Sequence, residues 1–138
     1  MGLFDVFKGK TPELSPRLSL AVGLLYMISA DGAIEQEEFG QLLATLHGDE
    51  KLLDNAMSYG RATKFEDYLS NSAALLSESQ KICILLNLAD SLLSDGVAAP
   101  QEQALFERFM EAWGISRSVF QPYLDVIIKK NDHAALGK

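Results

Sequence analysis

Two acidic segments of the chain combine residue types and spacing that suit a hard cation. The segment "ISADGAIEQEEF" contains Asp31, followed by glycine, and Glu38 seven residues after that aspartate. The segment "LSDGVAAPQEQALF" repeats this arrangement with Asp95 and Glu102. Carboxylate oxygens are the ligands that calcium and magnesium prefer in proteins. These four side chains are therefore the candidate metal ligands.

Neither segment is an EF-hand calcium loop. If Gly32 took the sixth position of such a loop, Met27 and Ser29 would stand where the first two carboxylate ligands are required. In the second copy those positions hold Ser91 and Leu93. The residues before each Asp-Gly pair also continue an apolar helical pattern, so the sequence excludes the EF-hand interpretation.

Both segments also have the features of a corner between two helices. Asp-Gly is a preferred turn pair, and Glu38 and Glu102 would occupy the third position of the following helix, where glutamate caps the backbone. The usual Ser or Thr cap is missing, because Glu35 and Ala99 stand at those positions. An aspartate such as Asp31 in the last turn of a helix opposes the helix dipole. Structural corner and cation site both remain open on the sequence.

The number of oxygens limits what one corner could bind. One aspartate and one bidentate glutamate supply about three oxygens, whereas calcium takes about six to eight. The two corners together supply about six, enough for calcium or magnesium if the fold brings them face to face. With two histidines and one cysteine in the chain, zinc or another soft metal is not expected.

The two corners belong to an internal repeat with an offset of 64 residues. Its polar matches pair Asp31 with Asp95 and Glu38 with Glu102, and a register kept over about 30 residues indicates a duplication. The apolar matches are Leu18 with Ile82, Leu20 with Ile84, Val22 with Leu86, Leu24 with Leu88, Ile28 with Leu92, Leu42 with Phe106, and Leu46 with Met110.

The signals between the apolar runs predict an all-α fold of about seven helices. Ser15, followed by proline, is typical of a helix start, and Ser77 with Gln80 forms a capping-box pair. Gly48 and Gly114 are typical of helix ends. The expected helices lie near residues 16–30, 36–47, 50–62, 65–76, 78–94, 100–113 and 117–130.

Each repeat begins with a helix that is apolar nearly all round, "LSLAVGLLYMI" and "ICILLNLADSLL". Such helices are buried on most sides, so the two are expected to pack together at the centre of an internally duplicated bundle. Cys83 is expected to be a buried structural thiol. The predicted core is Leu18, Val22, Leu25, Ile82, Leu85, Leu86, Ala89 and Leu92, with Phe106, Phe109, Met110, Trp113, Phe120 and Tyr123 in the core or half-buried.

Length and composition narrow the class of protein. The 138 residues suit one helical domain over residues 15–130, with a flexible or docking tail at 1–14 and a second tail at 131–138. A net charge of −7 argues against a nucleic-acid binder, because phosphate contacts need a basic face. We expect no transmembrane segment and no signal peptide. A single cysteine fits a reducing cytoplasm.

Two Asp-Gly-x-(apolar)-x-x-x-Glu corners, each after a buried apolar helix, resemble the tellurite-resistance TerB family, which includes the N-terminal region of certain DnaJ-like co-chaperones. The ending "MEAWGIS" of the second copy resembles the helix stop of that family. The resemblance covers roughly residues 15–130 and implies a bundle of about seven helices in a stress-response or membrane-associated setting. It also implies a divalent-cation role for Asp31, Glu38, Asp95 and Glu102.

The sequence has no Gly-rich phosphate loop, no GxSxG elbow and no zinc-protease motif, so we expect no enzyme. Our first hypothesis is a cytoplasmic, non-enzymatic TerB-like module that coordinates calcium or magnesium and acts through an unidentified protein partner, including one at the membrane surface. The alternative is a pure protein–protein interaction domain whose Asp-Gly corners are structural. The sequence leaves a homodimer open.

Overall fold

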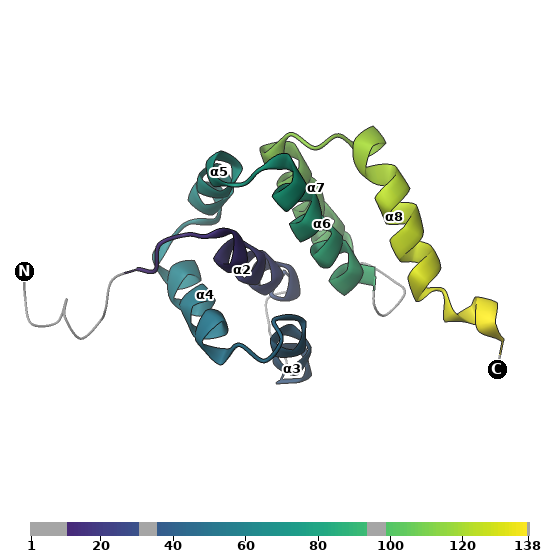
Figure 1. The fold of residues 1–138 in the computed structure, drawn as a ribbon, viewed down its shortest axis with the longest axis horizontal. Coiled ribbons are helices and arrows are strands. Elements are labelled where there is room, and N and C mark those ends of the chain that lie inside the picture. The colour runs from purple at the N-terminus through teal and green to yellow at the C-terminus, as the bar shows by residue number, and fades with distance from the viewer. Residues whose placement is uncertain (1–10, 31–35, 94–98, 138) are drawn as a thin grey trace, which may run out of the picture.

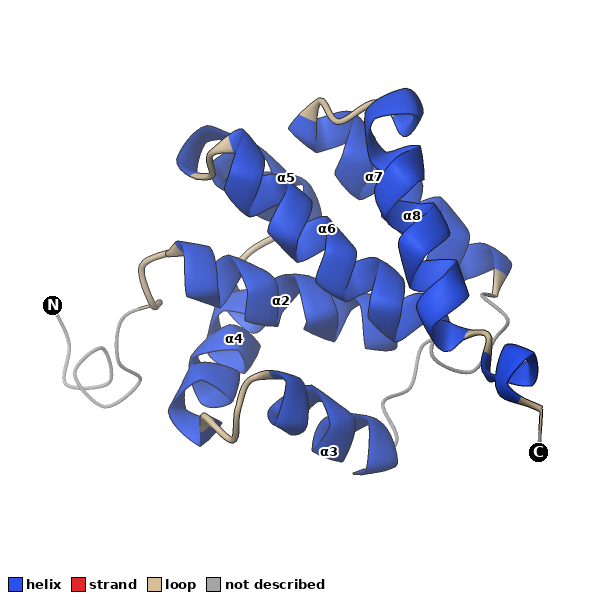
Figure 2. Cartoon of the chain, turned by 45° about the vertical axis from the view of Figure 1, so that its right-hand side comes forward, coloured by secondary structure: helices blue, strands red, loops and turns tan. Residues whose placement is uncertain are grey.

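The protein is described by a computed structural model over residues 11–30, 36–93 and 99–137. These ranges contain α-helices and one 3₁₀ turn but no strand, which confirms the all-α prediction (Figures 1 and 2). The elements are α2 (Pro16–Ile28), α3 (Gln36–Thr45), α4 (Glu50–Ala62), α5 (Phe65–Leu75), α6 (Glu78–Leu93), α7 (Pro100–Trp113), α8 (Arg117–Asn131) and η1 (His133–Leu136).

The helix boundaries follow the caps that the sequence contains. The Ser15 side chain accepts a hydrogen bond of 3.1 Å from the Leu18 backbone N–H at the start of α2. Ser77 and Gln80 exchange the two hydrogen bonds of a capping box, at 2.9 and 3.1 Å, at the start of α6. Gly114 ends α7 in the left-handed region with φ of 68°. Local signals therefore suffice to define most helix ends.

The duplication predicted from the sequence is visible in how the helices pack. In the first half α2 contacts α3 and α4, and in the second half α6 contacts α7 and α8 in the same order. Figure 1 shows these two groups side by side, with α5 at one end of the bundle. The two central helices α2 and α6 also contact each other, as predicted. Each half is thus a central helix covered by the two helices that follow a corner.

Equivalent positions of the two halves connect the central helix to its third helix. Near the end of α2, the Tyr26 hydroxyl donates a hydrogen bond of 3.3 Å to the Thr63 carbonyl, just after α4. The residue 64 positions later is Asp90, which accepts hydrogen bonds from Lys130 and Asn131 at the end of α8. The equivalent positions 26 and 90 therefore make a neutral contact in the first half and an ionic contact in the second half.

Most of the predicted core is confirmed, and five side chains are corrected. Leu25, Ile82 and Leu86 are only partly buried. Cys83 is exposed instead of buried, and Tyr123 is 41% exposed instead of half-buried or in the core. Both lie on helices that are apolar on several sides, so apolarity alone does not identify their buried face. The predicted residues found buried are Leu18, Val22, Leu85, Ala89, Leu92, Phe106, Phe109, Trp113 and Phe120.

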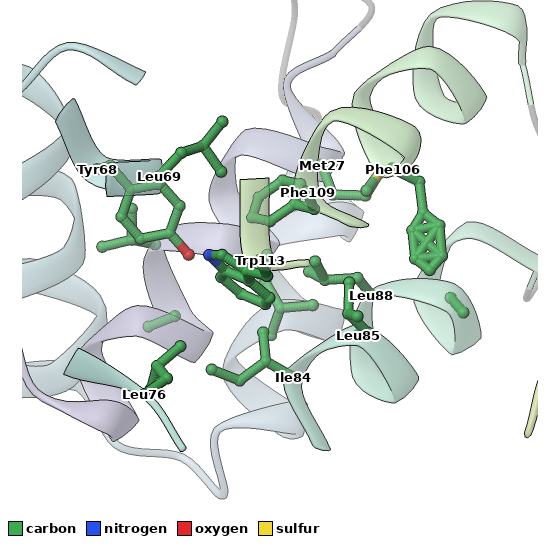
Figure 3. Close-up of a cluster of buried hydrophobic side chains, with 14 of the residues drawn as sticks. Met27, Tyr68, Leu69, Leu76, Ile84, Leu85, Leu88, Phe106, Phe109 and Trp113 are labelled. Atoms are coloured by element: carbon green, nitrogen blue, oxygen red, sulfur yellow. The ribbon is translucent and has the colours of Figure 1, made fainter. Parts of the chain in front are cut away.

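A buried polar chain links α7, α5 and α2 through this core, in the region shown in Figure 3. The Trp113 indole N–H donates to the Ser72 hydroxyl at 2.9 Å, and that hydroxyl donates to the Tyr68 carbonyl at 2.7 Å. The Tyr68 hydroxyl in turn donates to the Ser19 carbonyl at 2.7 Å. Because buried polar groups are costly when unpaired, this chain favours one arrangement of the three helices.

Two fully buried serines differ in what their hydroxyls do, which gives a matched pair of substitutions. Ser72 bonds Trp113 and Tyr68, whereas the Ser19 hydroxyl has no hydrogen-bond partner among the described residues. We expect Ser72→Ala to lower the free energy of unfolding by about 1–3 kcal/mol, because it leaves the indole N–H unpaired. Ser19→Ala should raise it by about 1 kcal/mol.

The measurement is urea denaturation followed by circular dichroism, on both variants at one pH. Equal losses of stability in Ser19→Ala and Ser72→Ala would mean that the Trp113 bond contributes nothing specific.

Candidate functional site

Only half of the predicted metal ligands lie in the described part of the chain. Asp31 and Asp95 fall outside it, together with the glycines that follow them. Glu38 lies in the first turn of α3 and Glu102 in the first turn of α7. The convergence of the two corners therefore stays a prediction.

Glu102 acts as a helix cap. Its Oε1 accepts a hydrogen bond of 3.0 Å from the backbone N–H of Ala99, the residue just before α7. The alanine supplies no side-chain hydrogen bond in return, so only the glutamate half of a capping box is present. This contact is the one expected from the structural interpretation of the second corner.

Glu38 lines a cavity between α2, α3 and α6 that has both polar and apolar residues in its wall. The cavity has a volume of about 290 Å³, and a second carboxylate, from Asp90, also lines it. Within the described residues, no group of three or more His, Cys, Asp or Glu side chains could hold a metal ion. The other polar residues that line the cavity are Gln41, Thr45, Asn87 and Ser91.

Asp90 is already engaged by α8. Both of its carboxylate oxygens accept from Lys130 Nζ at 3.0 Å, and Oδ1 also accepts from Asn131 Nδ2 at 2.9 Å. Partial burial raises the pKa of this carboxyl, but the hydrogen bonds from Asn131 and Lys130 and the lysine charge together hold the pKa below its ordinary value. The ionised form of Asp90 therefore favours the folded state.

This lowered pKa predicts an acid dependence of stability. Because the folded pKa lies below the unfolded value of about 3.9, the contribution of Asp90 is complete above that value and is lost as the pH falls through the folded pKa. Asp90→Asn should be less stable than the wild type at pH 7 and should approach it at acidic pH. Since the Asp90 side chain is 42% exposed and the pair is partly screened, the difference should be below about 1 kcal/mol.

Urea denaturation at a series of pH values measures this difference. The matched control is Asp54→Asn, at an exposed aspartate of α4. A pH dependence that is the same in both variants would contradict the role of Asp90.

A different surface stands out on α8 and the turn that follows it. Of the six large apolar side chains that are exposed among the described residues, five lie between residues 119 and 136. The sixth is Leu75, on α5. Val126 is 67% exposed and Leu136 is 80% exposed. The other three are Val119, Tyr123 and Ile128. We call Val119, Tyr123 and Val126, which lie along one side of α8, the α8 surface.

A groove between α7, α8 and the end of α6 lies on a different side of α8. Its volume is about 250 Å³, and it is lined by Ile128, which lies about half a turn around the helix from Val119. An ion pair of 3.2 Å joins Arg117 on α8 to Glu107 on α7, both of which line the groove. The apolar lining consists of Leu92, Leu93, Phe106, Met110, Phe120, Leu124 and Ile128.

The sequence did not lead us to the α8 surface: Tyr123 was predicted to be in the core or half-buried, and no role was predicted for Val119, Val126 or Ile128. A signal was available: seven apolar side chains within residues 119–128 are too many for one helix face. They are Val119, Phe120, Tyr123, Leu124, Val126, Ile127 and Ile128.

No described helix is long and apolar enough to cross a membrane. Comparisons of the chain with protein-family models, with curated proteins and with solved structures gave no match.

Proposed function

We propose that the chain is a TerB-like, non-enzymatic binding module that docks another protein through the α8 surface. The observation that carries this proposal is the concentration of exposed large apolar side chains on α8 and η1. Contiguous apolar surface on a small domain is typical of an interaction site, because its exposure to water is costly unless a partner covers it. The capping contact of Glu102 supports structural corners in this module.

A photo-cross-linking residue at position 126 tests the proposal in the cell that makes the protein. The internal repeat supplies the control, because Ala62 is the equivalent of Val126 and is also exposed, at the end of α4. We expect discrete adducts with another protein from position 126 and none from position 62. Equal adduct patterns, or none from either site, would remove α8 as the docking surface.

The second candidate function is the binding of a divalent cation at the acidic corners, which the TerB-like resemblance implies. Glu38 and Asp90 favour it, because both carboxylates line one cavity. Millimolar calcium or magnesium should then raise the melting temperature relative to EDTA, and Asp31→Asn combined with Asp95→Asn should abolish that rise. An identical melting temperature with metal and with EDTA would contradict this candidate function.

Both candidates keep the stress-response or membrane-associated setting that the resemblance implies and an unidentified protein partner, and the cytoplasmic location rests on the single cysteine. The two candidates can be tested separately. The cation experiment measures binding at the acidic corners, whereas the cross-linking experiment measures contacts of α8 with another protein.

A further inference from the structure

Helix α5 places two aromatic side chains between α2 and α7. The Phe65 ring centroid lies 4.7 Å from that of Tyr26 on α2 and 5.5 Å from that of Phe109 on α7. The Tyr68 ring centroid lies 5.9 Å from that of Phe109, and the Tyr68 hydroxyl donates to the Ser19 carbonyl at 2.7 Å. We call the space that this i, i+3 pair of rings occupies the α5 socket.

The internal repeat predicts a second socket of this kind between α6 and α3, because these helices are equivalent to α2 and α7 at the offset of 64. The cavity of about 290 Å³ between α2, α3 and α6 lies there. Four residues beside the Phe65–Tyr68 pair have their equivalents in the wall of this cavity. They are Gly23 with Asn87, Tyr26 with Asp90, Arg108 with Ala44, and Phe109 with Thr45. The cavity therefore corresponds to the α5 socket.

No described helix takes the place of α5 in this cavity. Residues 129–137, which are equivalent to residues 65–73 of α5, form the end of α8 and η1, and none of them lines the cavity. Leu24 in the cavity wall is only 2% exposed, whereas Ala44 and Thr45 at its edge are exposed. The cavity thus combines an apolar wall with a side that the described helices leave open.

One hydrogen bond specifies which aromatic pair fits the cavity. In the first half, Gly23 leaves room for the Tyr68 hydroxyl, which donates to the Ser19 carbonyl. In the second half, Asn87 stands at the position of that glycine, and its Nδ2 donates at 2.9 Å to the equivalent carbonyl, that of Cys83. The amide takes the place of the hydroxyl, so the second ring of an occupant needs no hydroxyl. A Phe-x-x-Phe pair therefore suits the cavity, where the α5 socket holds Phe-x-x-Tyr.

The chain itself contains such a pair at its N-terminus. Phe-x-x-Phe occurs in the sequence at Phe4–Phe7 and at Phe106–Phe109. The second pair is buried in the core, whereas the first lies in residues 1–10, outside the described residues. The segment "FDVF" also matches "FEDY" of α5 in having an acid directly after the first ring. The N-terminal segment is therefore the occupant that the sequence supplies.

The length of the N-terminal segment suits this place. Leu14 is half-buried against the core, so the link from Phe7 to Leu14 spans up to about 23–25 Å when extended. Leu24 in the cavity wall lies about 12 Å along α2 from Pro16, and a helix with its side chains is about 10–12 Å across. A segment tethered this closely has an effective concentration of about millimolar. The segment of the same molecule is thus favoured over that of a second copy.

We infer that the N-terminal segment docks in the cavity between α2, α3 and α6, with Phe4 and Phe7 in the places that Phe65 and Tyr68 take in the α5 socket. This inference goes beyond the proposed function, because it depends neither on the α8 surface nor on a cation. It gives a binding site within the chain to the docking tail that the sequence leaves open.

The test is paramagnetic relaxation in nuclear magnetic resonance spectra of the full, isotopically labelled chain. A nitroxide spin label is attached through Lys8→Cys, next to the Phe4–Phe7 pair, after the exposed native thiol has been removed by Cys83→Ser. The amide signals of Thr45 and Asn87, which line the cavity, should be broadened by the label.

Two variants should lose this broadening, and a matched control should keep it. Phe4→Ser combined with Phe7→Ser removes the rings that dock. Ala44→Glu places a charge at the exposed edge of the cavity. The control is Ala104→Glu, the same substitution at an exposed alanine of α7 that does not line the cavity. Circular dichroism checks that all three variants remain folded.

Other outcomes overturn the inference in distinguishable ways. No broadening, or broadening that persists when Phe4 and Phe7 are replaced, would overturn it and leave the docking function of α8 standing. Broadening in a mixture of isotopically labelled chain without the spin label and spin-labelled chain without the isotope would assign the cavity to the segment of a second copy. Sedimentation with phosphatidylserine–phosphatidylcholine vesicles that depends on Phe4 and Phe7, without broadening in solution, would replace the cavity with a membrane.

Discussion

Gly23→Val should lower the free energy of unfolding by about 3 kcal/mol or more. A Cβ atom at Gly23 in α2 would lie 3.0 Å from the Tyr68 hydroxyl oxygen, 3.5 Å from Leu88 Cδ2 and 3.6 Å from Phe109 Cε1. Overpacking a core typically costs about 1–3 kcal/mol. Displacement of Tyr68 would also break its buried hydrogen bond to the Ser19 carbonyl, at a cost of about 1–3 kcal/mol.

The matched control for this prediction is Gly60→Val, in α4. A Cβ at Gly60 meets nothing within 4 Å, and valine is a slightly better helix former than glycine. Gly60→Val should therefore stay within about 0.5 kcal/mol of the wild type. The midpoint of urea denaturation, with the slope checked for constancy, measures both variants. A small effect at position 23 would mean that α2, α5, α6 and α7 do not meet as closely as described.

Phe109→Ala should cost about 3–5 kcal/mol, the range for truncating a fully buried aromatic ring. Phe109 is 0% exposed, and its ring centroid lies 5.3–5.9 Å from those of Phe65, Tyr68 and Trp113. Truncation removes three edge-to-face contacts as well as buried apolar area, and it leaves a cavity among α2, α5 and α7. Near-ultraviolet circular dichroism should also lose intensity, because Trp113 loses its fixed neighbour.

Tyr123→Ala is the control for the loss of an aromatic ring. Tyr123 contacts one ring, that of Phe120, at 6.0 Å and is 41% exposed. Its truncation should cost less than about 1 kcal/mol, since little apolar area returns to water. If Phe109→Ala and Tyr123→Ala were equally destabilising, the aromatic cluster around Phe109 would not be the centre of the core.

The fold was predictable because the residues that set the helix ends act over short distances in the sequence. Ser15, the Ser77–Gln80 pair and Gly114 each set a helix end through contacts that span four residues or fewer. The predicted helix bounds differ from the observed ones by two residues at most. The largest differences are at the C-terminal ends of α2 and of α3. Shortly after α3, His47 and Gly48 both take positive φ. Such ends depend on the chain that follows, which apolar periodicity does not report.

The face of a helix that is apolar on several sides was not predictable in the same way. Cys83 and Tyr123 lie within strongly apolar runs, yet the packing of α6 and α8 leaves both exposed. Which side is covered depends on the positions of neighbouring helices, which are far away in sequence. The α8 surface was missed for this reason, and the same apolarity that suggested a core produced the candidate docking site.

The candidate metal site, too, was predictable from the sequence only in its local contacts. The sequence offered capping as one of two roles for Glu102, and the structure shows that contact, which reaches only three residues back to Ala99. Whether two corners 64 residues apart share a cation depends on long-range geometry that neither the sequence nor the described residues contain. Asp90, in contrast, comes into contact with Lys130 and Asn131 only through folding.

The different contacts at Tyr26 and Asp90 have a consequence for how the two halves respond to solution conditions. The Tyr26–Thr63 bond is neutral, and burial first, then the neighbouring Tyr59 and Glu66, raises the pKa of Tyr26 further from physiological pH. The Asp90–Lys130 pair is ionic and partly exposed, so salt screens it and acid protonates it. Ionic strength and acidity therefore loosen the end of α8 while the end of α4 stays fixed. A duplicated scaffold has in this way become asymmetric at one pair of equivalent contacts, since only the contact in the second half responds to salt and acid.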